Sequence, residues 1–184
     1  MRTLILAVGL QFIATVGWAA TSVVTDPGDV LDTRSTENML RASGTPLITV
    51  TSYVANGTVG NVIEFTNMTR VSGGGGILQT ALVNDDAGQN ALLELWLFNQ
   101  TFTPTADTIQ FVISEADMDN RIAVIDFAAG TYKDGGTVSG ATRGGLGIAY
   151  TLTGTSMFGV FVTRGTPDYV ATDDLTAILV TIPD

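Results

Sequence analysis

The longest apolar run of the chain lies at residues 91–98, where a single Glu interrupts a series of Ala, Leu, Trp and Phe. A run of this length predicts a strand that is buried on most of its surface. Residues 99–107 break the apolar pattern with Thr, Pro and Asp and predict a loop. Residues 109–113 and 121–127 predict two further strands. Between them, Ser114 stands before acidic residues and predicts the N-cap of one short helical turn, because its hydroxyl can accept from a free N–H group.

Short segments of alternating or continuous apolar residues recur along the rest of the chain. They predict strands at 47–54, 59–66, 77–83, 146–152, 157–164 and 175–182. Asn56-Gly57 predicts a β-hairpin between the first two, because both residues tolerate positive φ. The glycine-rich residues 133–145 predict a loop that bends most sharply at Asp134-Gly135-Gly136. We therefore expect an all-β fold of roughly eight or nine strands, an antiparallel β-sandwich similar to a jelly roll.

The N-terminal quarter of the chain has a different pattern. Residues 1–20 begin with a basic residue, continue as an apolar stretch and end in small residues. We expect an extended arm packed on its own subunit or on a neighbour, and a secretory targeting signal is the alternative. Residues 21–46 are polar and predict a linker with at most a short helix at 36–42. The expected domains are an arm and linker at 1–46 and a β-sandwich at 47–184.

Composition and charge exclude several classes of function. The 184 residues suit one domain plus an arm. With 8 Lys+Arg against 18 Asp+Glu, the net charge of −10 opposes contact with nucleic acid or with an anionic membrane surface. The chain has no His and no Cys, which excludes Ser-His-Asp and Cys-His catalysis and any disulfide. The low charged fraction, 14%, beside 45% hydrophobic residues indicates that some apolar surface is buried between subunits.

Two carboxylates are candidates for chemistry. Glu64 and Glu94 lie inside apolar strands, and a glycoside hydrolase needs two carboxylates that face each other across a cleft. A position on the exposed face of a strand explains each of them more simply. Three further acidic clusters lack the spacing of a calcium-binding EF-hand loop and are interpreted as solvated turn carboxylates. These clusters are Asp85-Asp86, Glu115/Asp117/Asp119 and Asp173-Asp174.

The remaining motifs are interpreted as structural. Four glycines at 73–76 lack the Lys-Ser/Thr of a phosphate-binding P-loop and predict a bulged connection. Seven aromatic residues at strand spacing predict core positions, with a ligand platform as the alternative; they are Trp96, Phe98, Phe102, Phe111, Phe127, Phe158 and Phe161. Four arginines at strand ends are interpreted as partners for carboxylates across an interface; they are Arg70, Arg121, Arg143 and Arg164. The sequence therefore predicts no catalytic residue, no metal site and no cofactor.

Several stretches between residues 47 and 184 resemble the head decoration, or cement, proteins of tailed phages. They are YVANGTVGNVIEFT at 53–66, NMTRVSGGGGILQTAL at 67–82, QNALLELWLF at 89–98, FTPTAD at 102–107, ISEADMDNRIAVI at 113–125 and FGVFVTRGTPDYVATDD at 158–174. The resemblance is a pattern of strand lengths and turn residues and contains no catalytic signature. It implies a β-sandwich that forms a homotrimer, binds the major capsid protein on the outer surface of the phage head and stabilises the shell of the virion.

That function requires no enzymatic activity and no small-molecule substrate. Many weak contacts on a symmetric lattice give high avidity without a strong single interface. The alternative is a secreted or tail-associated module that binds carbohydrate or acts as an adhesin. It rests on the signal-like residues 1–20 and on three Asn-x-Thr glycosylation sequons, at Asn56, Asn67 and Asn99.

Overall fold

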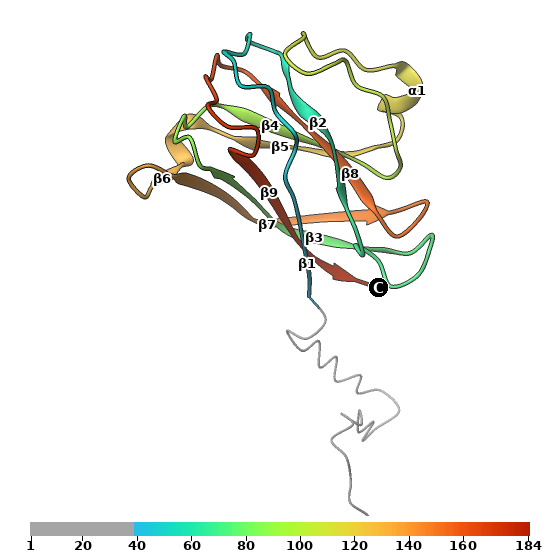
Figure 1. The fold of residues 1–184 in the computed structure, drawn as a ribbon. Helices are drawn as coiled ribbons and strands as arrows, with labels where there is room; N and C mark the ends of the chain where they lie inside the picture. Colours follow the sequence, from blue (N-terminus) through green and yellow to red (C-terminus); the bar gives the residue numbers. More distant parts are fainter. Residues whose placement is uncertain (1–38) are drawn as a thin grey trace, which may run out of the picture. The chain divides into compact units, whose positions relative to one another are not determined.

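Two antiparallel sheets pack face to face in the computed structural model, which describes residues 39–184 (Figure 1). The first sheet has the strand order β1-β9-β3-β7-β6. Its strands are β1 (Leu40–Gly44), β3 (Gly75–Asp85), β6 (Lys133–Asp134), β7 (Ser139–Thr151) and β9 (Leu175–Pro183). The second sheet has the order β2-β8-β4-β5. Its strands are β2 (Thr58–Phe65), β4 (Leu93–Phe98), β5 (Arg121–Phe127) and β8 (Met157–Thr163).

This arrangement confirms the predicted all-β sandwich. The main core lies between the sheets, and β4 shows how the sequence builds it. Leu93, Leu95 and Leu97 are fully buried and belong to the main core, because successive side chains of a strand point to opposite faces. Trp96 and Phe98 therefore point to the outer face of the same sheet. The predictions for residues 1–20 and for the start of the 36–42 helix lie outside the described residues.

The outer face of the four-stranded sheet is covered by its own chain. Phe98, Phe102 and Val160 form a second hydrophobic cluster there, and Phe111 and Ile113 pack against it. The loop between β4 and β5 supplies three of these side chains and carries α1 (Glu115–Met118) (Figure 1). The Ser114 hydroxyl accepts from the backbone N–H of Asp117 at 3.1 Å, so the predicted N-cap is confirmed. The continuous apolar run of β4 thus serves two cores, one on each face.

The predicted strand at 47–54 and its hairpin are wrong. Residues 47–54 run irregularly beside the loop between β8 and β9: the Ile48 N–H donates to the Thr172 carbonyl at 3.1 Å, and the Tyr53 N–H donates to the Pro167 carbonyl at 2.8 Å. Asn56 does have positive φ, 64°. However, β2 pairs with β8, because this long-range pairing places the apolar side chains of β2 in the core.

Three further predictions are corrected. Residues 109–113 form no strand and make a single bridge to Gly57, and Phe111 and Ile113 pack on the second cluster instead. Much of the predicted loop at 133–145 is strand, in β6 and the start of β7, although Gly136 does bend the chain with φ 105°. The predicted helix at 36–42 is wrong from Leu40 onward. There β1 pairs with β9, so the first strand of the sandwich lies within the segment assigned to the linker.

Candidate functional site

An open apolar groove of about 830 Å³ lies where the loop before β2 meets the loop after β4. Leu47 and Val50 form one wall, and they are 66% and 52% exposed. Phe102 and Pro104 line the other wall. The lining residues include no Lys or Arg, and their only charged residue is Asp107. The groove can therefore bind an apolar group, and it offers few polar groups to orient a substrate.

Asp107 holds both walls of this groove in place. Its carboxylate accepts hydrogen bonds from the backbone N–H of Thr49 at 2.8 Å and from that of Gly60 at 2.6 Å. It also accepts from its neighbour Thr108 and from the Tyr53 hydroxyl. Burial is the main cause that raises the pKa of Tyr53, and the Asp107 carboxylate adds to it. Because every partner is a donor within the chain, Asp107 acts as a structural clip.

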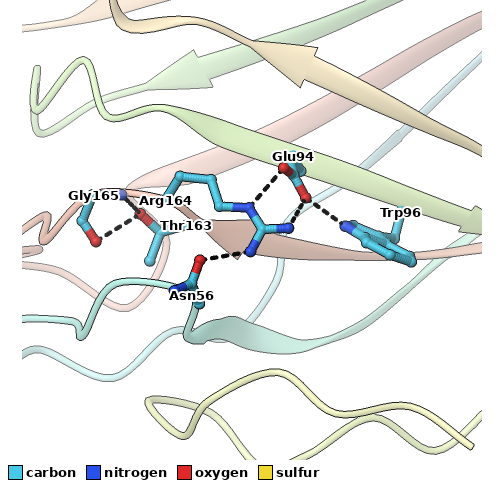
Figure 2. A network of polar contacts seen from close by, with 6 residues as sticks. All are labelled: Asn56, Glu94, Trp96, Thr163, Arg164 and Gly165. Atoms are coloured by element: carbon cyan, nitrogen blue, oxygen red, sulfur yellow. Dashed lines mark hydrogen bonds and ion pairs between the residues drawn. The ribbon is translucent and has the colours of Figure 1, made fainter.

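A polar network on the outer face of the four-stranded sheet contains Glu94 (Figure 2). Arg164 donates to both carboxylate oxygens, with Nε to Oε1 at 2.6 Å and Nη2 to Oε2 at 2.7 Å. A third nitrogen of Arg164 donates to Asn56 Oδ1 at 2.6 Å. Trp96 Nε1 donates to Glu94 Oε2 at 2.9 Å. The network joins the ends of β4 and β8 to the turn that precedes β2.

These contacts determine the charge state of Glu94. Burial acts to raise the pKa of this carboxyl, but the hydrogen bonds from Arg164 and Trp96 and the guanidinium charge outweigh burial, so the pKa is lowered. A general acid needs a raised pKa. Glu94 is therefore suited to a permanent ion pair with Arg164. Arg164 was expected to pair with a carboxylate across an interface, and its partner is instead a carboxylate of the same chain.

Glu64 and Glu94 do not form a catalytic pair. Both flank β8, where Glu64 is opposite Phe158 and Glu94 is opposite Val162. Four residues along one strand and two strand spacings across it separate the two Cα atoms by about 16 Å. The carboxyl groups of glycoside hydrolases lie roughly 5–9.5 Å apart. Glu64 is also exposed on its strand, as the simpler interpretation predicted.

Trp96 is not an open aromatic platform. The Arg121 guanidinium lies over its ring at 5.4 Å from the centroid, and the Phe111 ring packs at 5.0 Å. The ring is therefore occupied by two side chains of the same chain. Four of the seven predicted core aromatics are buried, namely Phe98, Phe102, Phe127 and Phe161. The other three pack against the second cluster.

The interpretation of Asp85 and Asp174 as solvated turn residues is wrong. Asp85 is fully buried and Asp174 is 6% exposed. Burial raises the pKa of Asp85, the backbone hydrogen bonds of its loop oppose that rise, and the nearby Asp174 charge adds to it. Asp174 caps its own loop by accepting from the Val170 and Ala171 N–H groups, each at 2.8 Å. Within residues 39–184, no cluster of three or more acidic side chains is placed to hold a metal ion.

No protein-family model, curated protein or solved structure matches the chain. Over the described part of the chain, no helix has the length and apolar character needed to cross a membrane.

The sequence analysis did not predict the groove or the role of Asp107. The available signal was an acid, Asp107, at the end of the predicted loop at 99–107, where a carboxylate commonly accepts from free backbone N–H groups.

Proposed function

We propose that the protein is a structural virion protein, a decoration or cement protein that binds the outer surface of a phage head as a trimer. Its partner would be the major capsid protein, and its action would be to stabilise the shell through surface contact. In this role the protein carries out no reaction and needs no cofactor.

The observation that carries the proposal is where the resembling stretches lie in the fold. Four of the six contain all or most of the strands of one sheet, β2, β4, β5 and β8, and a fifth lies in the loop that covers this sheet. The sixth, at 67–82, contains most of β3 in the other sheet. The stretches are dispersed in the sequence and contiguous in space. The resemblance therefore follows the strands of a sheet and the loop that covers it, and not a set of catalytic residues. This is what we expect of a protein that acts through its surface shape.

The candidate carboxylates support the same proposal. Glu94 is neutralised by Arg164, and Asp107 is used to hold the groove walls. The apolar groove and its exposed rim offer contact area to another protein. Buried apolar surface contributes about 25 cal/mol per Å² before the ordering costs of association, so even a few hundred Å² repeated over a shell is substantial.

The test is co-sedimentation of the purified full-length protein with expanded, undecorated capsids of the cognate coat protein. Saturable binding at a fixed number of copies per capsid, with greater resistance of the shell to heat or denaturant, is the expected result. Failure to co-sediment at micromolar protein would remove the proposal. A glycan-binding screen of the same sample tests the alternative of a carbohydrate-binding module, which the covered ring of Trp96 does not favour.

A further inference from the structure

The outer face of the five-stranded sheet is apolar although no part of either hydrophobic cluster lies on it. Ile77 and Leu82 of β3 and Val180 and Ile182 of β9 are half-buried, and Ile178 is 5% exposed. None of the five belongs to the two hydrophobic clusters of the described residues or packs against them. The alternate residues of β9, Leu175, Ala177 and Leu179, form the main core instead.

The strand register makes these residues one continuous stripe. Ile77 is opposite Ile182, and Leu82 is opposite Ile178. Val180 lies between these two pairs on β9. Met39, 44% exposed, precedes β1 at the same end of the sheet, because Leu40 is opposite Thr181. The apolar stripe, which we define as Met39, Ile77, Leu82, Ile178, Val180 and Ile182, crosses three neighbouring strands.

The two outer faces of the sandwich are treated differently by the chain. The loop between β4 and β5 covers the four-stranded sheet (Figure 1), and its Phe102 and Phe111 belong to or pack against the second cluster. Neither hydrophobic cluster of residues 39–184 extends over the apolar stripe. The six side chains lie side by side over three neighbouring strands, with exposure that runs from 5% at Ile178 to 44% at Met39. The largest contiguous apolar patch on the surface of a soluble protein is often an interaction site.

The charges indicate what covers the stripe. The chain has a net charge of −10, so two copies repel each other over most of their surfaces. The sheet positions on this face within and beside the stripe carry one charge, Arg41, which is opposite Val180. The carboxylate of Asp184 lies just past the end of β9. Copies of this chain can therefore meet here without burying like charges, and Arg41 of one copy can pair with an exposed carboxylate of another.

We propose that the apolar stripe is the surface through which copies of this chain associate with one another. The proposal deepens the proposed function and rests on it for the number of copies, three. A stable interface buries about 800 Å² on each partner. The stripe therefore forms the apolar centre of the contact, and the flanking Thr and Gly positions of β7 and β9 form its rim.

The test is sedimentation velocity of the full-length protein and of two double variants. Leu82→Asp with Val180→Asp places two carboxylates in the centre of the contact. Leu82→Thr with Val180→Thr replaces the apolar groups with the β-branched, polar side chain of Thr, which suits strands. Val112→Asp is the matched control, because Val112 is 61% exposed in the loop on the opposite side of the sandwich. Near-ultraviolet circular dichroism checks that each variant is folded.

The expected result is a trimer for the parent protein and for Val112→Asp, and association weakened at least about a hundredfold for Leu82→Asp with Val180→Asp. Each buried Leu or Val side chain contributes about tenfold or more to the association constant. A smaller loss is expected for the Thr variant. A parent protein that is monomeric at micromolar concentration, or a folded Asp or Thr variant that associates as tightly as the parent, overturns the proposal.

Capsid co-sedimentation of the same variants separates this proposal from the proposed function. If the stripe variants are monomeric and the parent trimer does not bind capsids, the proposed function is refuted, and self-association through the apolar stripe is supported. If the Asp variant remains trimeric but no longer binds capsids, the stripe contacts the coat protein and self-association through it is refuted.

Discussion

Removal of the Arg164 side chain should measure how strongly the sheet depends on its outer ion pair. The guanidinium makes two charge-assisted hydrogen bonds to Glu94 and one to Asn56. The Glu94 side chain is 14% exposed and that of Arg164 is 36% exposed. Arg164→Ala leaves a mostly buried carboxylate with Trp96 Nε1 as its remaining hydrogen-bond donor among these contacts.

The magnitude follows from geometry and exposure. A hydrogen bond to a charged group contributes about 1.5–3 kcal/mol, and exposure of Arg164 reduces that because water and salt screen the pair. We expect Arg164→Ala to lower the free energy of unfolding by about 2 kcal/mol. Glu94→Gln should lower it by about 1 kcal/mol, because the amide keeps the shape of the side chain. The coupling energy in the double-mutant cycle should be about 1 kcal/mol.

Urea unfolding at low salt, repeated in about 1 M NaCl, measures all four proteins of the cycle. Added salt should reduce the coupling energy because it screens a partly exposed pair. Arg143→Ala is the control, since Arg143 is an exposed arginine of β7 and should change stability by less than about 0.5 kcal/mol. A coupling energy below about 0.3 kcal/mol would refute the argument that this pair holds β4 to the end of β8.

The same pair has a defined pH dependence. Because the folded-state pKa of Glu94 is lowered, its contribution to stability is fully present above the unfolded-state value of about 4.3. That contribution is lost as the pH falls through the lowered folded-state value. The stability difference between the parent protein and Arg164→Ala should therefore shrink as the pH falls through the folded-state pKa. The part contributed by the Arg164–Asn56 hydrogen bond, which does not titrate, should remain.

Substitutions at three further positions test other contacts of the fold. Asp107→Ala should lower the free energy of unfolding by about 3 kcal/mol in urea, because several donors lose a shared carboxylate; a loss below about 1 kcal/mol would show that the groove walls hold without it. Asn56→Ala should be about 1 kcal/mol less stable than Asn56→Gly, because glycine adopts a φ of 64° without the strain that alanine has there; equal stabilities would contradict this. Asp85 has a raised folded-state pKa, so its folded state gains stability as the pH falls from that value to the unfolded-state value of about 3.9. Asp85→Asn should accordingly be more stable than the parent at pH 7 and lose this advantage in acid; a destabilised variant at pH 7 would refute it.

The periodicity of the sequence was sufficient to predict the fold class and most of the strands. The apolar alternation of β2, β8 and β9 and the apolar run of β4 lie at the predicted positions to within about two residues. Ser114 also specified its helical turn locally, because an N-cap needs only residues a few positions away. Each of these features depends on a short-range pattern.

The tertiary structure decided which strands pair with each other and which segments pack over the faces of the sheets. Residues 47–54 and 109–113 have strand-like composition, yet the first runs beside the loop after β8 and the second lies on the outer cluster. Local pattern does not state which distant segment a strand will meet, and the competition is settled by how much apolar surface each pairing buries. For the same reason the groove and its Asp107 clip, which join loops far apart in sequence, were not predicted.

The separation of Glu64 from Glu94 and the partnering of Glu94 with Arg164 were likewise fixed only in three dimensions. Their residue types allowed a catalytic pair, but the strand order put them on opposite sides of β8 and placed a guanidinium beside one of them. The sequence alone determined that this chain would form a two-sheet sandwich. The alternation of apolar and polar residues is a property of each strand by itself and does not depend on which strand it pairs with. Which carboxylates are neutralised, and which apolar face remains uncovered, depend on strand order and register, and these arise only when the whole chain has packed.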